Sequence, residues 1–253
     1  MPAATTTRQR WRRALLLVSF IAFPVTMNYF SPYLSVEGAF AGVLTGSLVM
    51  FGTMFLGSLV FGRLWCGWAC PMAGLQEFAI PVNGKPASRR ARYVKWFIWV
   101  PWFAAILFGA FSAGGFRVVD LLVGTEGGIS VAGSADRPIL IAYIMYFAVV
   151  ALFLGVAVAA GRRAGCHSIC WMAPFMVAGR WIRNRFGWPA LRLVATPDSC
   201  RECGKCSAAC PMGLEVQALV RNASMEDAEC VLCGSCVDIC PNKTLRYSFS
   251  ARR

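Results

Sequence analysis

The chain has 253 residues, of which 57% are hydrophobic and 15% are charged. Soluble domains have an apolar share of about 45–50%, so this composition excludes an ordinary soluble protein and indicates a lipid bilayer as the main solvent. The formal net charge of +13 would suit nucleic-acid binding. However, residues 1–195 hold 18 Lys and Arg against 5 Asp and Glu, whereas residues 196–253 hold 7 of each. The basic excess lies in the apolar part, so we expect it to set membrane topology and expect no nucleic-acid partner.

Four stretches without charged residues predict four transmembrane helices. They span residues 14–36, 38–62, 96–116 and 138–161. Each contains at least the roughly 20 residues that a helix needs to cross about 30 Å of hydrocarbon. A fifth charge-free stretch, residues 164–179, is shorter and predicts a re-entrant or interfacial helix. The fold class predicted for residues 1–195 is therefore an α-helical integral membrane domain.

Basic residues concentrate on one side of these predicted helices. Within residues 1–195, sixteen Lys and Arg precede residue 14, lie between residues 63 and 95, or follow residue 161. The other two connections contain only Arg117 and Arg137. Because loops rich in Lys and Arg stay in the cytoplasm, the pattern predicts a multi-pass membrane protein with both termini in the cytoplasm.

A pair of cysteines four residues apart follows each predicted helix pair. The first pair is Cys66 and Cys70, and the second, one hundred positions later, is Cys166 and Cys170. On a helix, residues at this spacing share a face, with β-carbons about 5–6 Å apart, so each pair can supply two ligands to one metal centre. Four thiolates suit an iron-sulfur, zinc or Cu(I) centre. The membrane domain is thus predicted as two helix-helix-CxxxC repeats. An additional redox metal centre, redox-active thiols and simple packing are the alternatives for these cysteines.

The C-terminal part contains two copies of the motif C-x-x-C-x-x-C-x-x-x-C-P. The first copy has Cys200, Cys203, Cys206 and Cys210, and the second has Cys230, Cys233, Cys236 and Cys240. This spacing is typical of proteins that bind two cubane 4Fe-4S clusters, in which the fourth cysteine of each run ligates the other cluster. Zinc sites use C-x-x-C pairs without the third step, and disulfides are disfavoured for thiols on the cytoplasmic side.

The rule that the fourth cysteine of each run ligates the other cluster, called the crossing rule below, predicts the ligands of both clusters. The first cluster is assigned Cys200, Cys203, Cys206 and Cys240, and the second is assigned Cys230, Cys233, Cys236 and Cys210. The sequence therefore predicts a two-cluster, α+β ferredoxin-like domain over residues 196–253, which follows the membrane domain of residues 1–195.

Together these features resemble the NapH/MauN-type ferredoxin-like membrane proteins, relatives of the NosR and FixG/CcoG proteins. The resemblance rests on the segment GRLWCGWACP, the second CxxxC corner, the four predicted spans and the two-cluster module, and covers about residues 12–247. It implies oxidation of membrane quinol, or a comparable donor, with electrons passing through the clusters to a redox partner protein. One departure is Trp171, which stands where the family's second corner usually has proline. The predicted outer loops also lack a haem-binding C-x-x-C-H motif, which argues against a full NosR or FixG equivalent.

Three polar residues near the corners are candidates for a quinol site. His167 is the only histidine, and an imidazole that titrates near neutral pH could accept a quinol proton. Arg63 and Glu77 flank the first corner and could orient a quinone headgroup. Ordinary interfacial roles are the alternative for all three. The predicted function is electron transfer from quinol, and the alternatives are a copper reduction or maturation factor and an iron-sulfur redox sensor.

Overall fold

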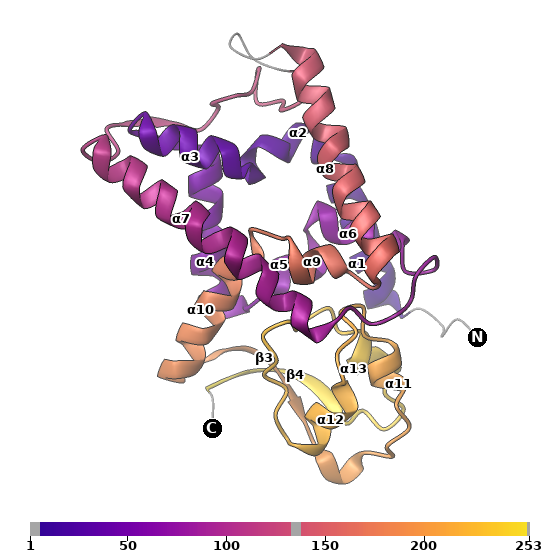
Figure 1. The fold of residues 1–253 in the computed structure, drawn as a ribbon. Coiled ribbons are helices and arrows are strands. Elements are labelled where there is room, and N and C mark those ends of the chain that lie inside the picture. The colour runs from indigo at the N-terminus through magenta and orange to yellow at the C-terminus, as the bar shows by residue number, and fades with distance from the viewer. Residues whose placement is uncertain (1–5, 133–137, 252–253) are drawn as a thin grey trace.

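The computed structural model describes residues 6–132 and 138–251, so Arg137 lies outside the described residues. A helical part stands above a small C-terminal module (Figure 1). The helical part contains α1 (Thr7–Ile21), α2 (Phe23–Thr26), η1 (Met27–Phe30), α3 (Pro32–Phe40), β1 (Val43–Thr45), α4 (Gly46–Phe61), α5 (Leu64–Trp68), α6 (Pro71–Phe78), η2 (Arg89–Tyr93), α7 (Val94–Ser112), β2 (Val118–Asp120), α8 (Ile139–Ala160), α9 (Ala164–Ser168) and α10 (Ala173–Phe186). The module contains β3 (Ala190–Ala195), η3 (Pro197–Ser199), α11 (Lys205–Ala208), α12 (Val216–Arg221), α13 (Ser235–Ile239) and β4 (Leu245–Ser250).

Two helices of the described residues are long and apolar enough to cross a membrane. One runs through η2 and α7, over Arg89–Ser112, and the other is α8. α1 meets the segment of α2 and η1 at a bend of 57°, so these helices give a third candidate only if the bent pair is one span. α4 is apolar but has 16 residues, fewer than the roughly 20 that a crossing takes. The described chain therefore offers two or three candidate spans, where the sequence predicted four.

The first two predicted windows are not continuous helices, which corrects that expectation. Pro24 lies in the first turn of α2. Proline removes a backbone donor and disfavours a helical residue before it, so the chain changes direction after α1 ends at Ile21. Gly42 follows α3 with a φ of 68°, a left-handed conformation that glycine adopts without strain. The short strand β1 comes next and pairs in parallel with β2, with Val43 opposite Val118.

Both cysteine corners have the same local construction. α4 is followed by Gly62 with a φ of 58°, and α8 by Gly161 with a φ of 101°. Each glycine turns the chain toward a five-residue helix, α5 or α9, that carries the first cysteine of the pair. A proline then lies in the first turn of the next helix, Pro71 in α6 and Pro174 in α10. The proline missing at position 171 thus has a counterpart three residues later, where proline suits a helix start.

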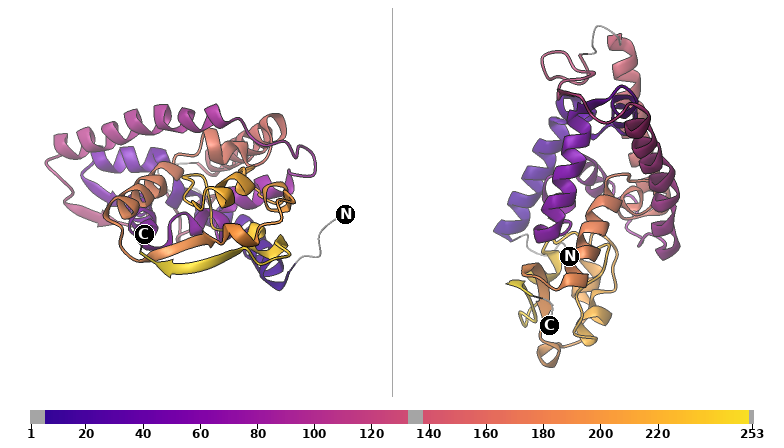
Figure 2. Two further views of the ribbon diagram at one scale, coloured as in Figure 1. Left: turned by 90° about the horizontal axis from the view of Figure 1, so that it is seen from below. Right: turned by 90° about the vertical axis from the view of Figure 1, so that its left-hand side faces the viewer.

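The C-terminal module is a small ferredoxin-like α+β unit. β3 and β4 form an antiparallel pair, with Ala190 opposite Ser250 and Ala195 opposite Leu245, and the left view of Figure 2 shows them side by side. The three short helices α11, α12 and α13 lie between these strands in sequence. Because β3 precedes residue 196, the sheet of the module reaches into the range assigned to the membrane domain. The exact division of domains stays a prediction.

Hydrogen bonds from the helical part hold the two cysteine runs in place. On α1, Gln9 Nε2 donates to the carbonyl of Cys233 at 3.0 Å. After α8, Arg162 Nη1 donates to the carbonyls of Ala208 at 2.8 Å and Cys210 at 3.3 Å. Each contact reaches the backbone of a cysteine run rather than a thiol. The module is therefore attached to the helical part while its thiols remain available as ligands.

Candidate iron-sulfur and membrane-edge sites

One cavity of the module is lined by the cysteines that the crossing rule assigns to the first cluster. They are Cys200, Cys203, Cys206 and Cys240. The cavity encloses about 390 Å³ of space not filled by atoms, including space open to solvent. Cys200 and Cys203 precede α11, Cys206 lies in α11, and Cys240 caps the end of α13. The structure thus brings this set together, and its ligation of a cluster stays a prediction.

A second cavity is lined by the cysteines assigned to the second cluster. They are Cys210, Cys230, Cys233 and Cys236, and this cavity also encloses about 390 Å³, counted in the same way. Apolar side chains such as Leu193 and Met212 form much of the remaining wall. Burial raises the pKa of Cys210 to about 12. A thiol in this setting stays protonated unless a metal centre stabilises its thiolate.

The backbone of the two runs has a matching conformation around these cavities. Glu202 (φ 54°) and Gly204 (φ 70°) flank the second cysteine of the first run. Leu232 (φ 51°) and Gly234 (φ 77°) flank the second cysteine of the other run. Left-handed residues within a turn direct backbone N–H groups into a concavity that favours anions, as found at many iron-sulfur sites. The backbone and the thiols therefore both fit a cubane cluster.

The cysteine sets suit clusters better than single ions. Among the described residues, no group of three or more His, Cys, Asp or Glu side chains lies close enough to hold one metal ion. A cubane spreads its four thiolates over separate iron atoms, so its ligands stand farther apart than those of one ion. The two sets also differ in exposure. Cys203 is exposed, whereas Cys233 and Cys236 are buried, so the first set lies at the module surface and the second lies inside.

The two CxxxC corners place four buried cysteines near one another. Cys66, Cys70, Cys166 and Cys170 are each at most 5% exposed. Burial, and then the other three thiols, raise the pKa of Cys70 well above its usual range, which places the four within electrostatic reach. The Cys66 thiol lies 3.8 Å from the Met176 sulfur. Gln76 Nε2 donates to the sulfur of Cys166 at 3.2 Å. The structure therefore gathers the corner thiols as the sequence predicts, and whether they bind metal stays a prediction.

The first corner packs directly against the second cysteine run. Trp68 Nε1 donates to the carbonyl of Leu232 at 3.1 Å. Next to it, a Cβ atom on Gly67 would lie 2.2 Å from the carbonyl oxygen of Val231. Only glycine allows this approach of the two backbones. The first corner and the second thiol set are therefore neighbours through the backbone.

We expect Gly67→Ala to push the corner away from the second run and to destabilise the chain by about 1–3 kcal/mol, as overpacking does. Gly57→Ala is the matched control, because no described atom other than its chain neighbours and the backbone of its own helix lies within 4 Å of the added Cβ. That control should change stability by less than about 1 kcal/mol. Thermal unfolding of both variants in detergent, followed by circular dichroism, measures the difference. Equal unfolding temperatures would show that the close contact at Gly67 does not matter.

Glu229 connects a buried cluster of positive side chains to the second run. Its Oε2 accepts from Arg63 Nη1 at 2.7 Å, and its Oε1 pairs with Lys95 Nζ. His167 Nδ1 lies 3.6 Å from the same carboxylate, and His167 Nε2 is within 3.0 Å of the carbonyl of Met212. Burial alone would raise the pKa of Glu229, but Arg63 and Lys95 outweigh it and the pKa falls to about 2. Glu229 is therefore a permanent negative charge next to Cys230.

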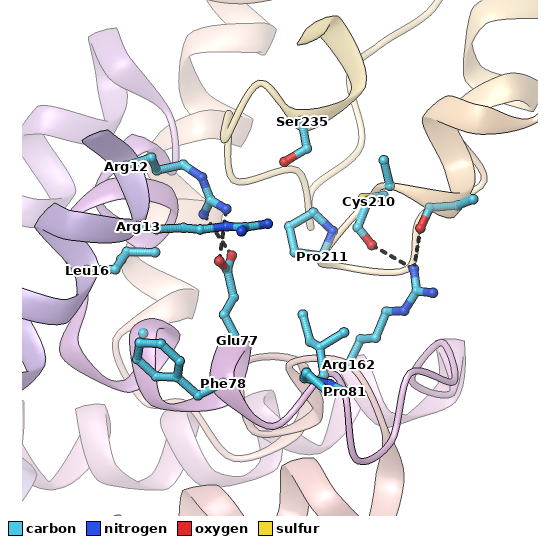
Figure 3. A pocket seen from close by; sticks show the side chains of 14 residues that line it. Arg12, Arg13, Leu16, Glu77, Phe78, Pro81, Arg162, Cys210, Pro211 and Ser235 are labelled. Carbon is cyan, nitrogen blue, oxygen red and sulfur yellow. Dashed lines mark hydrogen bonds and ion pairs between the residues drawn. The ribbon is translucent and has the colours of Figure 1, made fainter. Parts of the chain in front are cut away.

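Glu77 lies in a different place, at a cavity between the helical part and the module (Figure 3). The cavity encloses about 1000 Å³, including space open to solvent. Arg12 Nη1 bonds the Glu77 carboxylate at 2.7 Å and Arg163 Nη2 bonds it at 2.5 Å. Burial would raise the pKa of Glu77, yet Arg163 and Arg12 lower it. Glu77 therefore stays ionised and acts as a hydrogen-bond acceptor rather than as a proton acceptor.

The rest of this cavity combines apolar walls with basic groups. Leu16, Phe78, Ile80 and Pro81 contribute apolar surface, and Cys210 and Pro211 of the first run close one side. In Figure 3, Arg12 and Arg13 approach from one side and Arg162 lies near Cys210 on the other. Cys210 also lines the second thiol cavity. An amphipathic molecule bound here would touch a residue that the crossing rule assigns to a cluster.

The three residues predicted for a quinol site do not form one site. Arg63 and His167 both contact Glu229, whereas Glu77 faces the cavity beside Arg12. Sequence reasoning missed the partner that joins the first two, because nothing in the pattern marks the acidic residue before Cys230 as a buried anchor. It also missed Arg163. A signal for Arg163 was present, since Arg63 and Arg163 stand at the same distance before the two corners.

Comparisons with known proteins agree with this geometry. A 4Fe-4S binding domain family matches residues 43–87, which include the first corner, and a 4Fe-4S dicluster domain family matches residues 192–241, which include both cysteine runs. The chain is also 24% identical over 192 residues to the methylamine utilization ferredoxin-type protein MauN of Methylobacillus flagellatus. The chain is therefore similar to a ferredoxin-type protein and carries two segments that match 4Fe-4S families.

The alignment with MauN extends over only part of each protein. The alignment covers 71% of the chain and 60% of the relative. No solved structure matches the chain. These matches support an iron-sulfur, ferredoxin-type electron-transfer protein, and two apolar helices suggest association with a membrane.

Proposed function

We propose that this ferredoxin-type protein takes electrons from membrane quinol and passes them through its two 4Fe-4S clusters to a redox partner protein. The observation that carries the proposal is the backbone contact of the first corner, at Gly67 and Trp68, with the second cysteine run. The corner contacts the second run, whose Cys233 and Cys236 are buried, whereas Cys203 of the first set is exposed. When bound, the clusters supply one-electron donor and acceptor groups. Electrons would pass from the corner to the second cluster and then to the first cluster near the module surface.

The proposal includes four membrane crossings with both termini in the cytoplasm. α7 and α8 are two of them, and the bent unit of α1, α2 and η1 and the short apolar helix α4 are the others. The basic residues of the corners and of α10, such as Arg162 and Arg185, then face the cytoplasm by the positive-inside rule. The cysteine runs lie on that same side in a reducing compartment, as clusters require.

The cavity beside Glu77 is the proposed position of the quinol headgroup. Its apolar residues, including Leu16 and Phe78, suit a lipid-soluble molecule, and Arg13 and Ser235 offer polar contacts. Oxidation of a quinol to a quinone releases an electron pair and a pair of protons. Because Glu77 is held ionised between Arg12 and Arg163, solvent in the open cavity takes the protons. The residues of the chain position the headgroup next to Cys210.

The experiment is anaerobic addition of a water-soluble quinol analogue to the purified protein while the visible absorbance of the clusters is followed. We expect bleaching in the native protein and a much slower rate in Ala208→Trp, which fills the cavity from its exposed rim. Ala218→Trp, an exposed position on α12 outside the cavity, should react at the native rate. Dithionite should bleach all three proteins equally. No bleaching of the native protein by quinols, although dithionite reduces it, would refute the proposed donor.

A second function, reduction or delivery of copper, is favoured by one observation. The sulfur of Met176 lies 3.8 Å from the thiol of Cys66, and mixed thiolate and thioether ligands select Cu(I). If this function holds, the anaerobically purified protein should bind Cu(I) with an affinity that falls at least tenfold in Met176→Leu. Leucine keeps the apolar volume, so the fold should tolerate the change. Unchanged affinity would remove the reason to prefer copper.

A further inference from the structure

Two arginines at the membrane-edge corners are buried without enough hydrogen-bond acceptors. Arg63 and Arg163 are both 0% exposed. Nε and Nη2 of Arg63 and Nε of Arg163 have no partner in the described part of the chain. A buried donor left unpaired costs about 1–3 kcal/mol, and more for a charged group. Some additional acceptor is therefore expected beside these guanidinium groups.

The corner cysteines contact or act electrostatically on both arginines. Arg163 Nη1 donates to the carbonyl of Cys66 at 3.0 Å. Burial would lower the pKa of Arg63, but Glu229 and then Cys66 and Cys170 favour its charged form and the pKa is raised. Cys166, then Cys233 of the second run and Cys70, act in the same sense on Arg163. Each arginine therefore lies within electrostatic range of cysteines from both corners.

The balance of buried charge points to an anion at the corners. Glu229 is shared by Arg63 and Lys95, and Glu77 is shared by Arg163 and Arg12. Each carboxylate thus serves two cations, so positive charge remains in excess. Neutral thiols accept hydrogen bonds only weakly. Four thiolates, in contrast, carry more negative charge than a divalent ion or a cubane core supplies in positive charge, and their sulfur atoms accept N–H donors.

We propose that Cys66, Cys70, Cys166 and Cys170 together hold one additional iron-sulfur cluster, and that Arg63 and Arg163 are its counter-ions. The match of a 4Fe-4S family to residues 43–87 covers only the first pair of these cysteines, and the structure supplies the second pair from residues one hundred positions away. The cluster would add a redox centre at the membrane edge, beside the second cysteine run. The presence of this cluster can be tested without quinol. Only its role in electron transfer rests on the proposed function.

The first arm of the test counts metal in the full-length protein, purified and reconstituted anaerobically with iron and sulfide. Two cubanes give about eight irons per chain, and a third would give about twelve. We expect Cys66→Ala combined with Cys166→Ala to lose only the additional iron and one set of signals in electron paramagnetic resonance. About eight irons in both proteins would overturn the proposal. Zinc or copper in place of the additional iron would overturn it as well.

The second arm measures the midpoint potential of the additional signal in arginine variants. Reduction adds negative charge to the centre, so loss of a counter-ion disfavours the reduced form. We expect Arg63→Gln and Arg163→Gln to lower this potential, and Arg63→Lys to recover most of the shift because it keeps the charge. Retention of the eight irons of the two C-terminal clusters serves as the check that these variants fold.

Arg183 provides the matched control. It is also 0% exposed, and its Nε and Nη2 atoms lack hydrogen-bond partners among the described residues, although Nη2 lies 3.7 Å from Glu226 Oε1. Its nearest charged neighbours are Arg180, Glu226 and Arg192, and the thiol that acts on it is Cys230 of the second run rather than a corner cysteine. We expect Arg183→Gln to leave the potential of the additional signal unchanged. The counter-ion role is refuted if Arg63→Gln and Arg163→Gln shift that potential no more than Arg183→Gln does.

Discussion

Glu229→Gln is expected to destabilise the chain by about 3–5 kcal/mol, because removal of one partner leaves buried charges uncompensated. Arg63 and Lys95 are 0% and 1% exposed, and both pair with this carboxylate. Glutamine keeps the size and one acceptor oxygen but removes the charge. The effect should reach the second cysteine run, since Glu229 precedes Cys230 and joins it to α5, α7 and α9. We expect the cluster of that run to be lost at lower denaturant concentration than in the native protein.

Glu202→Gln is the control for the loss of one carboxylate in the same module. Glu202 pairs with Arg221 at 2.6 Å, but both side chains are more than half exposed. Exposed pairs of this kind contribute little to stability, because water screens them. This variant should therefore unfold at the same denaturant concentration as the native protein. Denaturant unfolding in detergent, followed by the visible absorbance of the clusters, compares the two. Equal effects of the two substitutions would mean that the buried network does not hold the module in place.

Cys203→Ala and Cys240→Ala are expected to remove the same cluster and about half of the iron of the two runs. The two residues belong to different runs, yet both line the first cavity. Cys233→Ala and Cys210→Ala should remove the other cluster, because both line the second cavity. Iron and sulfide analysis with electron paramagnetic resonance of the reduced protein distinguishes the two losses. If Cys240→Ala instead removed the cluster that Cys233→Ala removes, each run would bind its own cluster and the crossing assignment would be wrong.

The spacing of the cysteines along the sequence was enough to predict which of them the structure places together. The runs around Cys203 and Cys233 have a spacing with a single chemical explanation, and the structure gathers each set in a cavity. The equivalence of Cys66 and Cys166 was also visible, because the same pattern recurs at the same distance after a helix pair. In both cases the pattern lies within a short stretch of sequence, so the prediction requires only that two such stretches lie together in the fold.

Contacts between distant segments could not be predicted in the same way. The partner of Arg63 is Glu229, 166 positions later, and no periodicity relates them. The continuous helices expected over residues 14–36 and 38–62 are interrupted near Pro24 and Gly42. Hydropathy is averaged over many residues. It therefore detects the length of an apolar stretch but not a turn that a single proline or glycine introduces into it. The separation of Glu77 from His167 likewise depends on how α6 and α9 pack.

The most direct test of the proposed electron path uses the full-length protein in liposomes that contain quinol. A water-soluble electron acceptor outside the vesicles reports turnover, and Cys203→Ala removes an exposed cysteine that we propose as a ligand of the first cluster. Quinol-dependent reduction of the acceptor by the native protein, with loss of most of that rate in Cys203→Ala, is the predicted result. An equal rate in the two proteins would contradict it, since electrons would then leave the protein without passing through the exposed cluster.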